Sequence, residues 1–326
     1  MENLMIPKKE QIFGECRLKP IEKRGTAAFI TDYAILNGGH YSIDDNTLKN
    51  NGSYFLNYYE KIKNHGILNY VDEFGGIERG YITKGVGIRP ILNFSEICRL
   101  YPNLKIETAS DGVLEVLFGE YLQMAADSDM QNELNNIMLV NQLSVTKEKR
   151  EELKEIMGLE EIIKTDYSYT RNTYRYNSFY PETIPVYEYK KRKFAKVVAN
   201  TMFFNNCNFE LENLEEYKNG DGVWVEEQPI KWLVSEKEDV MISEKIIQAG
   251  IRFDKDDCLM YMCIPQYYQT EMKKYTDRYL KKEIFREDYV YQKKWFNYAK
   301  NILSCCITPI YKEEYLHSFL VNRSFS

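Results

Sequence analysis

The sequence has little histidine, no long apolar run and no paired spacing among its cysteines. Its three histidines lie far apart, and none belongs to an H-x-x-x-H pair of the kind that binds zinc. No segment approaches the roughly 18 apolar residues of a membrane-spanning helix, and the first residues lack the apolar core of a signal peptide. We therefore expect a cytoplasmic protein that binds no metal and no membrane.

Motifs for nucleophilic catalysis and phosphate binding are also missing. There is no G-x-S-x-G elbow, and the glycine-rich "GVGIRP" (Gly85–Pro90) leads into a strand, unlike a dinucleotide-binding loop. The seven cysteines are odd in number and form no C-x-x-C pair, which is typical of free thiols in a reducing compartment. These absences predict a protein without a cofactor.

Charge is mildly acidic, with 49 acidic against 43 basic residues and a net charge of −6. Non-specific nucleic-acid binding depends on basic groups that neutralise phosphates, so this balance disfavours it. One basic cluster, "YKKRKFAK" (Tyr189–Lys196), is interleaved with aromatic residues. It is either a solvated hairpin tip or a contact for RNA or an acidic protein. Its candidate binding residues are Lys190, Lys191, Arg192 and Lys193.

What the chain has in abundance is tyrosine, 27 residues, within an aromatic content of 14%. Tyrosine favours half-buried strands, and it also favours binding surfaces because it offers rigid contact area at low entropic cost. The second interpretation predicts that two tyrosine-bearing loop regions, 37–59 and 167–180, contact a partner. The candidate residues are Tyr41, Tyr54, Tyr58, Tyr59, Tyr167, Tyr169, Tyr174 and Tyr176.

Hydrophobic periodicity predicts strands and helices in one chain. Residues 26–97 are expected to form short strands and loops, with a short helix capped near Ser95. A strand over 116–125 leads into a helix that carries Met130, Leu134, Ile137 and Met138 at helical spacing. A second helix begins after Thr146 and breaks at Gly158. Further strands are expected around 185–198, 223–234 and 240, then a turn and a short helix, with two helices near the C-terminus.

Two separated segments resemble parts of a single domain. "PIKWLVSEKEDVMISEKIIQAGIRFD" (Pro229–Asp254) resembles the opening of bacterial domains distantly related to the formylglycine-generating sulfatase modifiers, and Tyr275–Phe285 resembles the helix that follows. "SYFLNYY" (Ser53–Tyr59), "GILNYVDEFGGI" (Gly66–Ile77) and "GVGIRPIL" (Gly85–Leu92) are similar to the closing part of such domains. The resemblance implies a circularly permuted order, which is tolerated where domain termini lie close together.

This resemblance implies an α+β fold with a C-type-lectin-like, sulfatase-modifying-factor-like mixed sheet. The closing half would occupy residues 1–110, a helical and aromatic insert 111–185, and the opening half with C-terminal helices 186–326. Residues 88–92 and 224–234 would then share a sheet. The residues with structural roles would be Arg89 beneath a strand end, Pro90 at the strand's edge or terminus, and Trp224 and Trp232 in the sheet.

The resemblance also argues against an oxidase. Formylglycine-generating enzymes carry copper-binding cysteines in the closing part, whereas this chain has no cysteine between Phe29 and Leu92. We therefore expect a non-catalytic protein-binding protein of bacterial or phage origin, in its sharpest form a phage-encoded, anti-CRISPR-like inhibitor of a bacterial defence system. Two alternatives remain, an enzyme with a site built from His40, Asp44, Arg89 and Glu226, and a nucleic-acid binder using residues 190–196.

Overall fold

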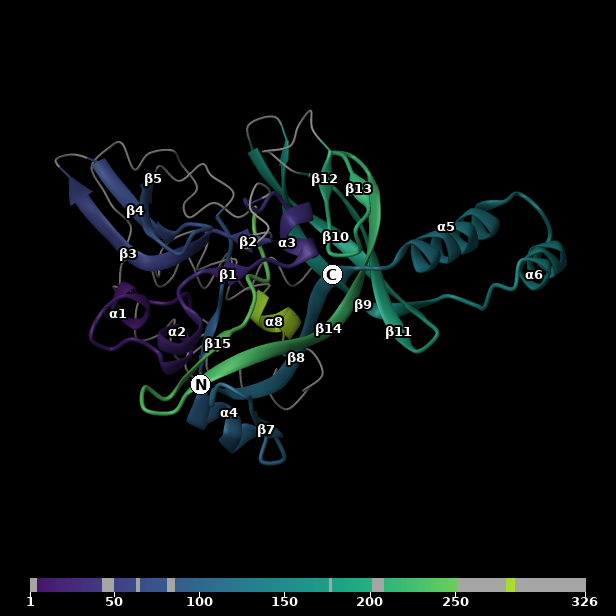
Figure 1. Cartoon of the computed structure of the whole chain (residues 1–326). Helices are drawn as coiled ribbons and strands as arrows, with labels where there is room; N and C mark the ends of the chain where they lie inside the picture. The colour runs from purple at the N-terminus through teal and green to yellow at the C-terminus, as the bar shows by residue number, and fades with distance from the viewer. Residues whose placement is uncertain are drawn as a thin grey trace, which may run out of the picture. The chain divides into compact units, whose positions relative to one another are not determined.

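The structure is a computed structural model that describes residues 5–42, 50–62, 65–80, 86–175, 178–200, 208–250 and 280–284. These residues belong to one compact unit spanning residues 2–284. The unit is a mixed α+β fold, as predicted, and its described residues contain more strand than helix (Figure 1).

The main sheet has eight antiparallel strands, six of which follow one another in a single path. In spatial order these six are β6 (Ile91–Asn93), β15 (Val240–Ser243), β14 (Gly222–Ser235), β11 (Arg192–Val198), β10 (Ser178–Tyr189) and β9 (Ile163–Arg175). The two other strands are β8 (Leu114–Ala125), which pairs with β14, and β7 (Ile106–Thr108), which pairs with β8.

Strand β14 is shared by both halves of this sheet. Its first half pairs with β11 and its last four residues pair with β15, while β8 pairs along its other edge. Both Trp224 and Trp232 on β14 are fully buried. The Trp232 indole N–H donates to the Phe118 carbonyl at 2.7 Å, so this buried donor is satisfied. The sheet therefore holds both tryptophans in its core, where a structural role was predicted.

The two segments that resemble opposite ends of a domain meet in this sheet. Leu92 pairs with Met241, and Ile242 pairs with Leu233, so β15 joins β6 to β14. The buried Arg89 side chain donates from Nε to the carbonyl of Ser243 at 3.0 Å. Pro90 lies directly before β6, outside the paired positions, where its missing N–H breaks no ladder bond. The two segments thus share a sheet, as predicted, with β15 between β6 and β14.

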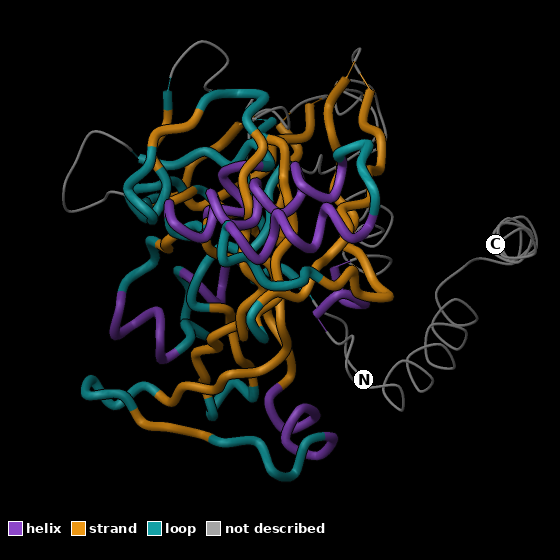
Figure 2. The backbone as a smooth tube through the Cα atoms, turned by 90° about the vertical axis from the view of Figure 1, so that its right-hand side faces the viewer, coloured by secondary structure: helices purple, strands orange, loops and turns teal. Residues whose placement is uncertain are grey.

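Smaller elements surround the sheet. The helices are α1 (Lys9–Ile12), α2 (Lys19–Arg24), α3 (Asp32–Leu36), α4 (Phe94–Leu100), α5 (Ser128–Gln142), α6 (Lys147–Ile156) and α8 (Lys281–Ile284). The remaining strands are β1 (Ala28–Phe29) with β2 (Asn51–Gly52), β3 (Tyr54–Ile62) with β4 (His65–Val71) and β5 (Ile77–Gly80), and β12 (Phe209–Glu210) with β13 (Glu216–Tyr217). Figure 2 looks onto α5 and α6, which lie in front of the strands.

Several local predictions were wrong. Residues 167–175 and 178–180 are not loop residues, because they lie in strands β9 and β10. The short helix expected after β15 is replaced by single bridges from Ile246 to Ile30 and from Gln248 to Ile88. Helix α4 is capped by Asn93, whose side chain accepts from the Glu96 N–H at 2.7 Å, and not by Ser95. Apart from α8, the predicted C-terminal helices lie outside the described residues.

Candidate functional site

Helix α5 is anchored on the sheet through Trp224. The side-chain amide of Gln131 donates to the Trp224 carbonyl at 2.7 Å and accepts from the Trp224 N–H at 2.9 Å. Asn135 accepts from the Trp224 indole N–H at 3.0 Å. A buried cluster surrounds these bonds and includes Met130, Leu134, Ile137, Tyr189 and Phe194. Apolar packing and directed hydrogen bonds together hold α5 in one orientation on β14.

Helix α6 packs on α5 and has the predicted ends. The Thr146 hydroxyl accepts from the Lys149 N–H at 3.3 Å and caps the first turn. The helix stops at Met157 because Gly158 adopts a left-handed backbone, with φ of 64°. We call residues 128–157, which contain α5 and α6, the helical arm.

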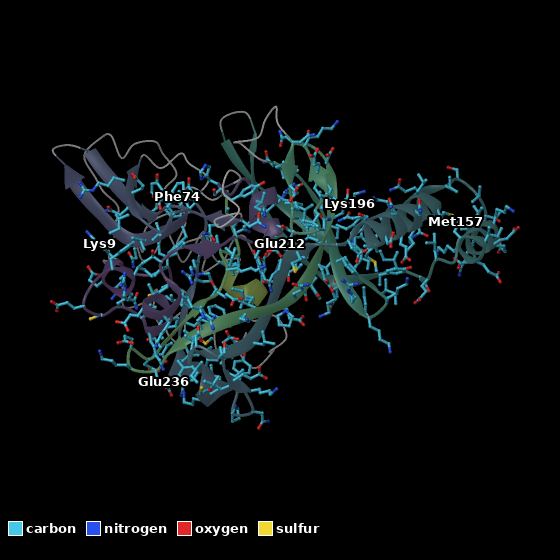
Figure 3. The ribbon with its side chains drawn as sticks, viewed as in Figure 1. Lys9, Phe74, Met157, Lys196, Glu212 and Glu236 are labelled. Carbon is cyan, nitrogen blue, oxygen red and sulfur yellow. The ribbon has the colours of Figure 1, made fainter. Side chains whose placement is uncertain are left out.

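The helical arm carries apolar side chains that are 40% or more exposed. They are Leu139 (62% exposed), Leu143 (40%), Val145 (40%), Ile156 (72%) and Met157 (46%). Figure 3 shows Met157 on the arm and Lys196 near its base. Single exposed apolar residues are ordinary, but several within one short helical pair are typical of an interaction surface.

The charged residues next to Ile156 and Met157 in the sequence are acidic. Glu155, Glu160 and Glu161 are exposed, and among the described residues no ion pair joins them to a basic side chain. Two basic residues of α6 are paired within the helix, Lys149 with Glu152 at 2.8 Å and Lys154 with Glu151 at 3.2 Å. We call the set Glu155, Ile156, Met157, Glu160 and Glu161 the arm end. It combines exposed apolar area with unpaired negative charge.

The basic cluster predicted from the sequence is a hairpin tip whose charges are mostly paired. Lys190 and Lys191 form the two-residue turn between β10 and β11. Lys190 pairs with Glu133 at 2.7 Å, and Arg192 binds Glu226 through two bonds of 2.6 and 2.7 Å. Only Lys191 of the four candidates makes no ion pair within the described part of the chain. Little positive charge is left for phosphates.

Three of the candidate binding residues meet around the buried carboxylate of Glu227. The hydroxyls of Tyr167 and Tyr169 donate to the Glu227 carboxylate at 3.0 and 2.8 Å, and Lys193 lies 3.4 Å from it. Lys193 also pairs with Glu120 at 3.0 Å. The Glu227 side chain is fully buried, so this network stabilises the packing of β9 on the sheet. Sequence reasoning missed Glu227, although the Tyr-x-Tyr spacing places both phenols on one face of a strand.

Other tyrosines predicted to contact a partner are core residues. Tyr54 is fully buried and Tyr41 is 3% exposed. Their hydroxyls donate to the carbonyls of Thr26 and Glu210, at 2.8 and 3.2 Å. Burial raises the pKa of the Tyr54 phenol above its ordinary value. The surface assignment of these residues was wrong, because an internal carbonyl satisfies each hydroxyl.

The side chains of the four remaining candidate tyrosines lie outside the described part of the chain. Tyr58 and Tyr59 lie in β3 and Tyr174 lies in β9, with side chains outside the described part, and Tyr176 lies wholly outside it. Of the seven cysteines, the described thiols are Cys16, which is exposed, and Cys98, which is half-buried; both are free.

The residues proposed for an enzyme site have separate partners. His40 Nδ1 lies 3.5 Å from Glu73, and the Ser53 hydroxyl donates to the same carboxylate oxygen at 3.1 Å. The acid thus stands between serine and histidine, whereas activation of a serine needs the imidazole in the middle. Arg89 contacts Ser243 and the Tyr54 ring, Glu226 binds Arg192, and Asp44 lies outside the described residues.

Comparison with known proteins gives no match. No family model matches the chain, and neither a curated protein nor a solved structure is significantly similar to it.

No helix in the described ranges combines the length and apolar character that crossing a bilayer requires. The same ranges contain no group of three or more His, Cys, Asp or Glu side chains that could hold a metal ion.

Proposed function

We propose that this chain is a non-catalytic protein-binding protein that contacts its partner through the helical arm. The observation that carries this proposal is the set of exposed apolar side chains on helices that Trp224 anchors. A rigid apolar surface loses little conformational entropy when it binds, which favours recognition by such an arm. In this proposal the buried tyrosines, such as Tyr54 and Tyr169, belong to the interior of the scaffold and not to its contact surface.

The scaffold itself, we propose, is a permuted C-type-lectin-like domain related to the sulfatase modifiers. The pairing of β6 with β15 and of β15 with β14 supports this relationship, because these strands come from the two segments that resemble its closing and opening parts. A cytoplasmic bacterial or phage protein of this kind acts by occupying a partner's surface. An inhibitor of a bacterial defence system is one such role.

The test compares partner capture by matched variants of the full chain. The tagged protein, an Ile156→Ser/Met157→Ser variant and a Leu117→Ser/Leu214→Ser control are incubated with host lysate, with and without nuclease. The control residues are also exposed, at 61% and 76%, but lie outside the arm. We expect one stoichiometric protein that survives nuclease, is kept by the control and is lost from the arm variant. Capture that depends on nucleic acid, or that the arm variant retains, would overturn the proposal.

A further inference from the structure

We infer that the arm end binds a basic amphipathic segment of a partner protein, in which lysine or arginine flanks an apolar stripe. This inference rests on the proposed function and specifies the chemistry of the partner.

The exposure of Ile156 and Met157 is selective. Gly158 reverses the chain after α6, and the next two apolar residues, Leu159 and Ile162, pack against the core cluster around Trp224. The segment after α6 therefore packs against the core cluster, whereas Ile156 and Met157 remain 72% and 46% exposed. A flexible methionine beside a branched aliphatic residue adapts to apolar side chains of varied shape.

The charge of the same segment selects the partner. Residues 155–164 contain Glu155, Glu160 and Glu161 but a single basic residue, Lys164. Because the three carboxylates make no ion pair within the described structure, a cationic partner would supply the missing counter-charges. The salt-dependent field of these carboxylates would also accelerate association with such a partner.

The same charge disfavours the other possible occupants. A second copy of this chain would bring its own three glutamates to the surface, so self-association through two arm ends places like charges together. Nucleic acid and anionic lipid surfaces are repelled for the same reason. A helix with apolar residues on one face and basic residues beside them matches both the apolar area and the charge.

The experiment uses two synthetic helical peptides, one of leucine and lysine and one with glutamate at every lysine position. Affinity for the full chain is measured by fluorescence anisotropy at low and high salt. We expect the lysine peptide to bind at least about tenfold more tightly than the glutamate peptide, with binding that weakens as salt rises. Equal binding of the two peptides, or no binding of the lysine peptide, would overturn the inference.

Two variants locate the site. Ile156→Ser/Met157→Ser should abolish binding of the lysine peptide, and Glu155→Gln/Glu160→Gln/Glu161→Gln should weaken it about tenfold and flatten its salt dependence. The Leu117→Ser/Leu214→Ser control should bind normally. Unchanged affinity in the glutamine variant would refute the inference. Sedimentation that shows a dimer dispersed by Ile156→Ser/Met157→Ser would also refute it, since the occupant would then be a second copy.

The two proposals fail differently. If the lysate partner survives Ile156→Ser/Met157→Ser, the arm is not the binding surface and the proposed function fails. If that partner is lost from the apolar variant but bound normally by the glutamine variant, the proposed function stands and the partner is not basic.

Discussion

The hairpin tip at Lys190–Lys193 and the arm end at Glu155–Glu161 are both short charged segments. They differ in how many of their charges form ion pairs. At the hairpin tip three of four basic side chains pair with acids from α5, β8 and β14. At the arm end three carboxylates pair with nothing in the described structure. The denser cluster in the sequence is therefore the less available one in the folded chain.

Position explains this difference. The hairpin tip leads into β11, which lies beside β14 and therefore beside Glu226 and Glu227. The arm end comprises the last residues of α6 and the residues that follow it, and α6 packs on α5. A charged segment inside a sheet meets cross-strand neighbours on each side, whereas the end of a helix meets few. The following changes test this contrast, from the largest expected effect to the smallest.

Removing the anchor of the arm should have the largest effect. Trp224→Ala deletes a fully buried indole and the indole N–H from which Asn135 accepts, so the free energy of unfolding should fall by about 3–5 kcal/mol. Urea denaturation measures the loss, and hydrogen exchange should show α5 amides opening faster. Trp224→Phe, which keeps most apolar area, should cost less. A loss below about 1 kcal/mol for the alanine variant would mean that the arm is not held through this residue.

The buried carboxyl of Asp32 should make the free energy of unfolding depend on pH. Asp32 accepts from the N–H groups of Ala125 and Glu212, and its pKa is raised from 3.8 to about 6, chiefly by burial. The folded chain then holds this proton to higher pH than the unfolded chain does. The free energy of unfolding should therefore decrease as pH rises from about 4 to about 6, by at most roughly 3 kcal/mol.

Urea denaturation at several pH values checks this slope. Asp32→Asn should remove it, because the amide does not titrate, whereas Glu155→Gln should leave it unchanged. A slope that persists in Asp32→Asn would assign the proton to another group.

Relieving the backbone strain in the turn at Lys190 and Lys191 should stabilise the protein. Lys190 and Lys191 have φ of 50° and 62°, a left-handed conformation that disfavours residues other than glycine and asparagine. Lys190→Asn/Lys191→Gly should raise the free energy of unfolding by about 1 kcal/mol, after the loss of one surface ion pair. Thermal unfolding measures the gain. Lys190→Ala/Lys191→Ala removes the same charges but not the strain, and should give no gain; an equal gain would exclude strain as the cause.

Neutralising the arm end should leave stability unchanged. Glu155→Gln/Glu160→Gln/Glu161→Gln removes exposed charges without partners, so the free energy of unfolding should stay within about 0.5 kcal/mol. The same denaturation series measures it. A clear loss of stability would show that these carboxylates stabilise the fold and would contradict their assignment to partner binding.

Sequence reasoning located features that depend on local pattern. Thr146 and Gly158 predicted the ends of α6, and the spacing of Met130, Leu134 and Ile137 predicted the buried face of α5. It failed where partners come from distant segments. Tyr169 and Glu227 are 58 residues apart, so neither pattern nor composition indicates that a phenol and a carboxylate share a buried site. The sequence shows an Ile-Met pair between glutamates at the arm end, but only the folded structure shows that both side chains are exposed.

The placement of β14 has a consequence for how the chain reaches its native state. Asn93 bonds to Asp239, 146 residues later, so the early strand β6 has no sheet to join until the segment that carries β14 and β15 has been synthesised. Contacts of such long range slow folding and leave early strands exposed to aggregation. A ribosome-bound chain that stops before residue 222 lacks the strand on which β8, β11 and β15 assemble. We therefore expect folding to wait for the late part of synthesis and to be sensitive to C-terminal truncation.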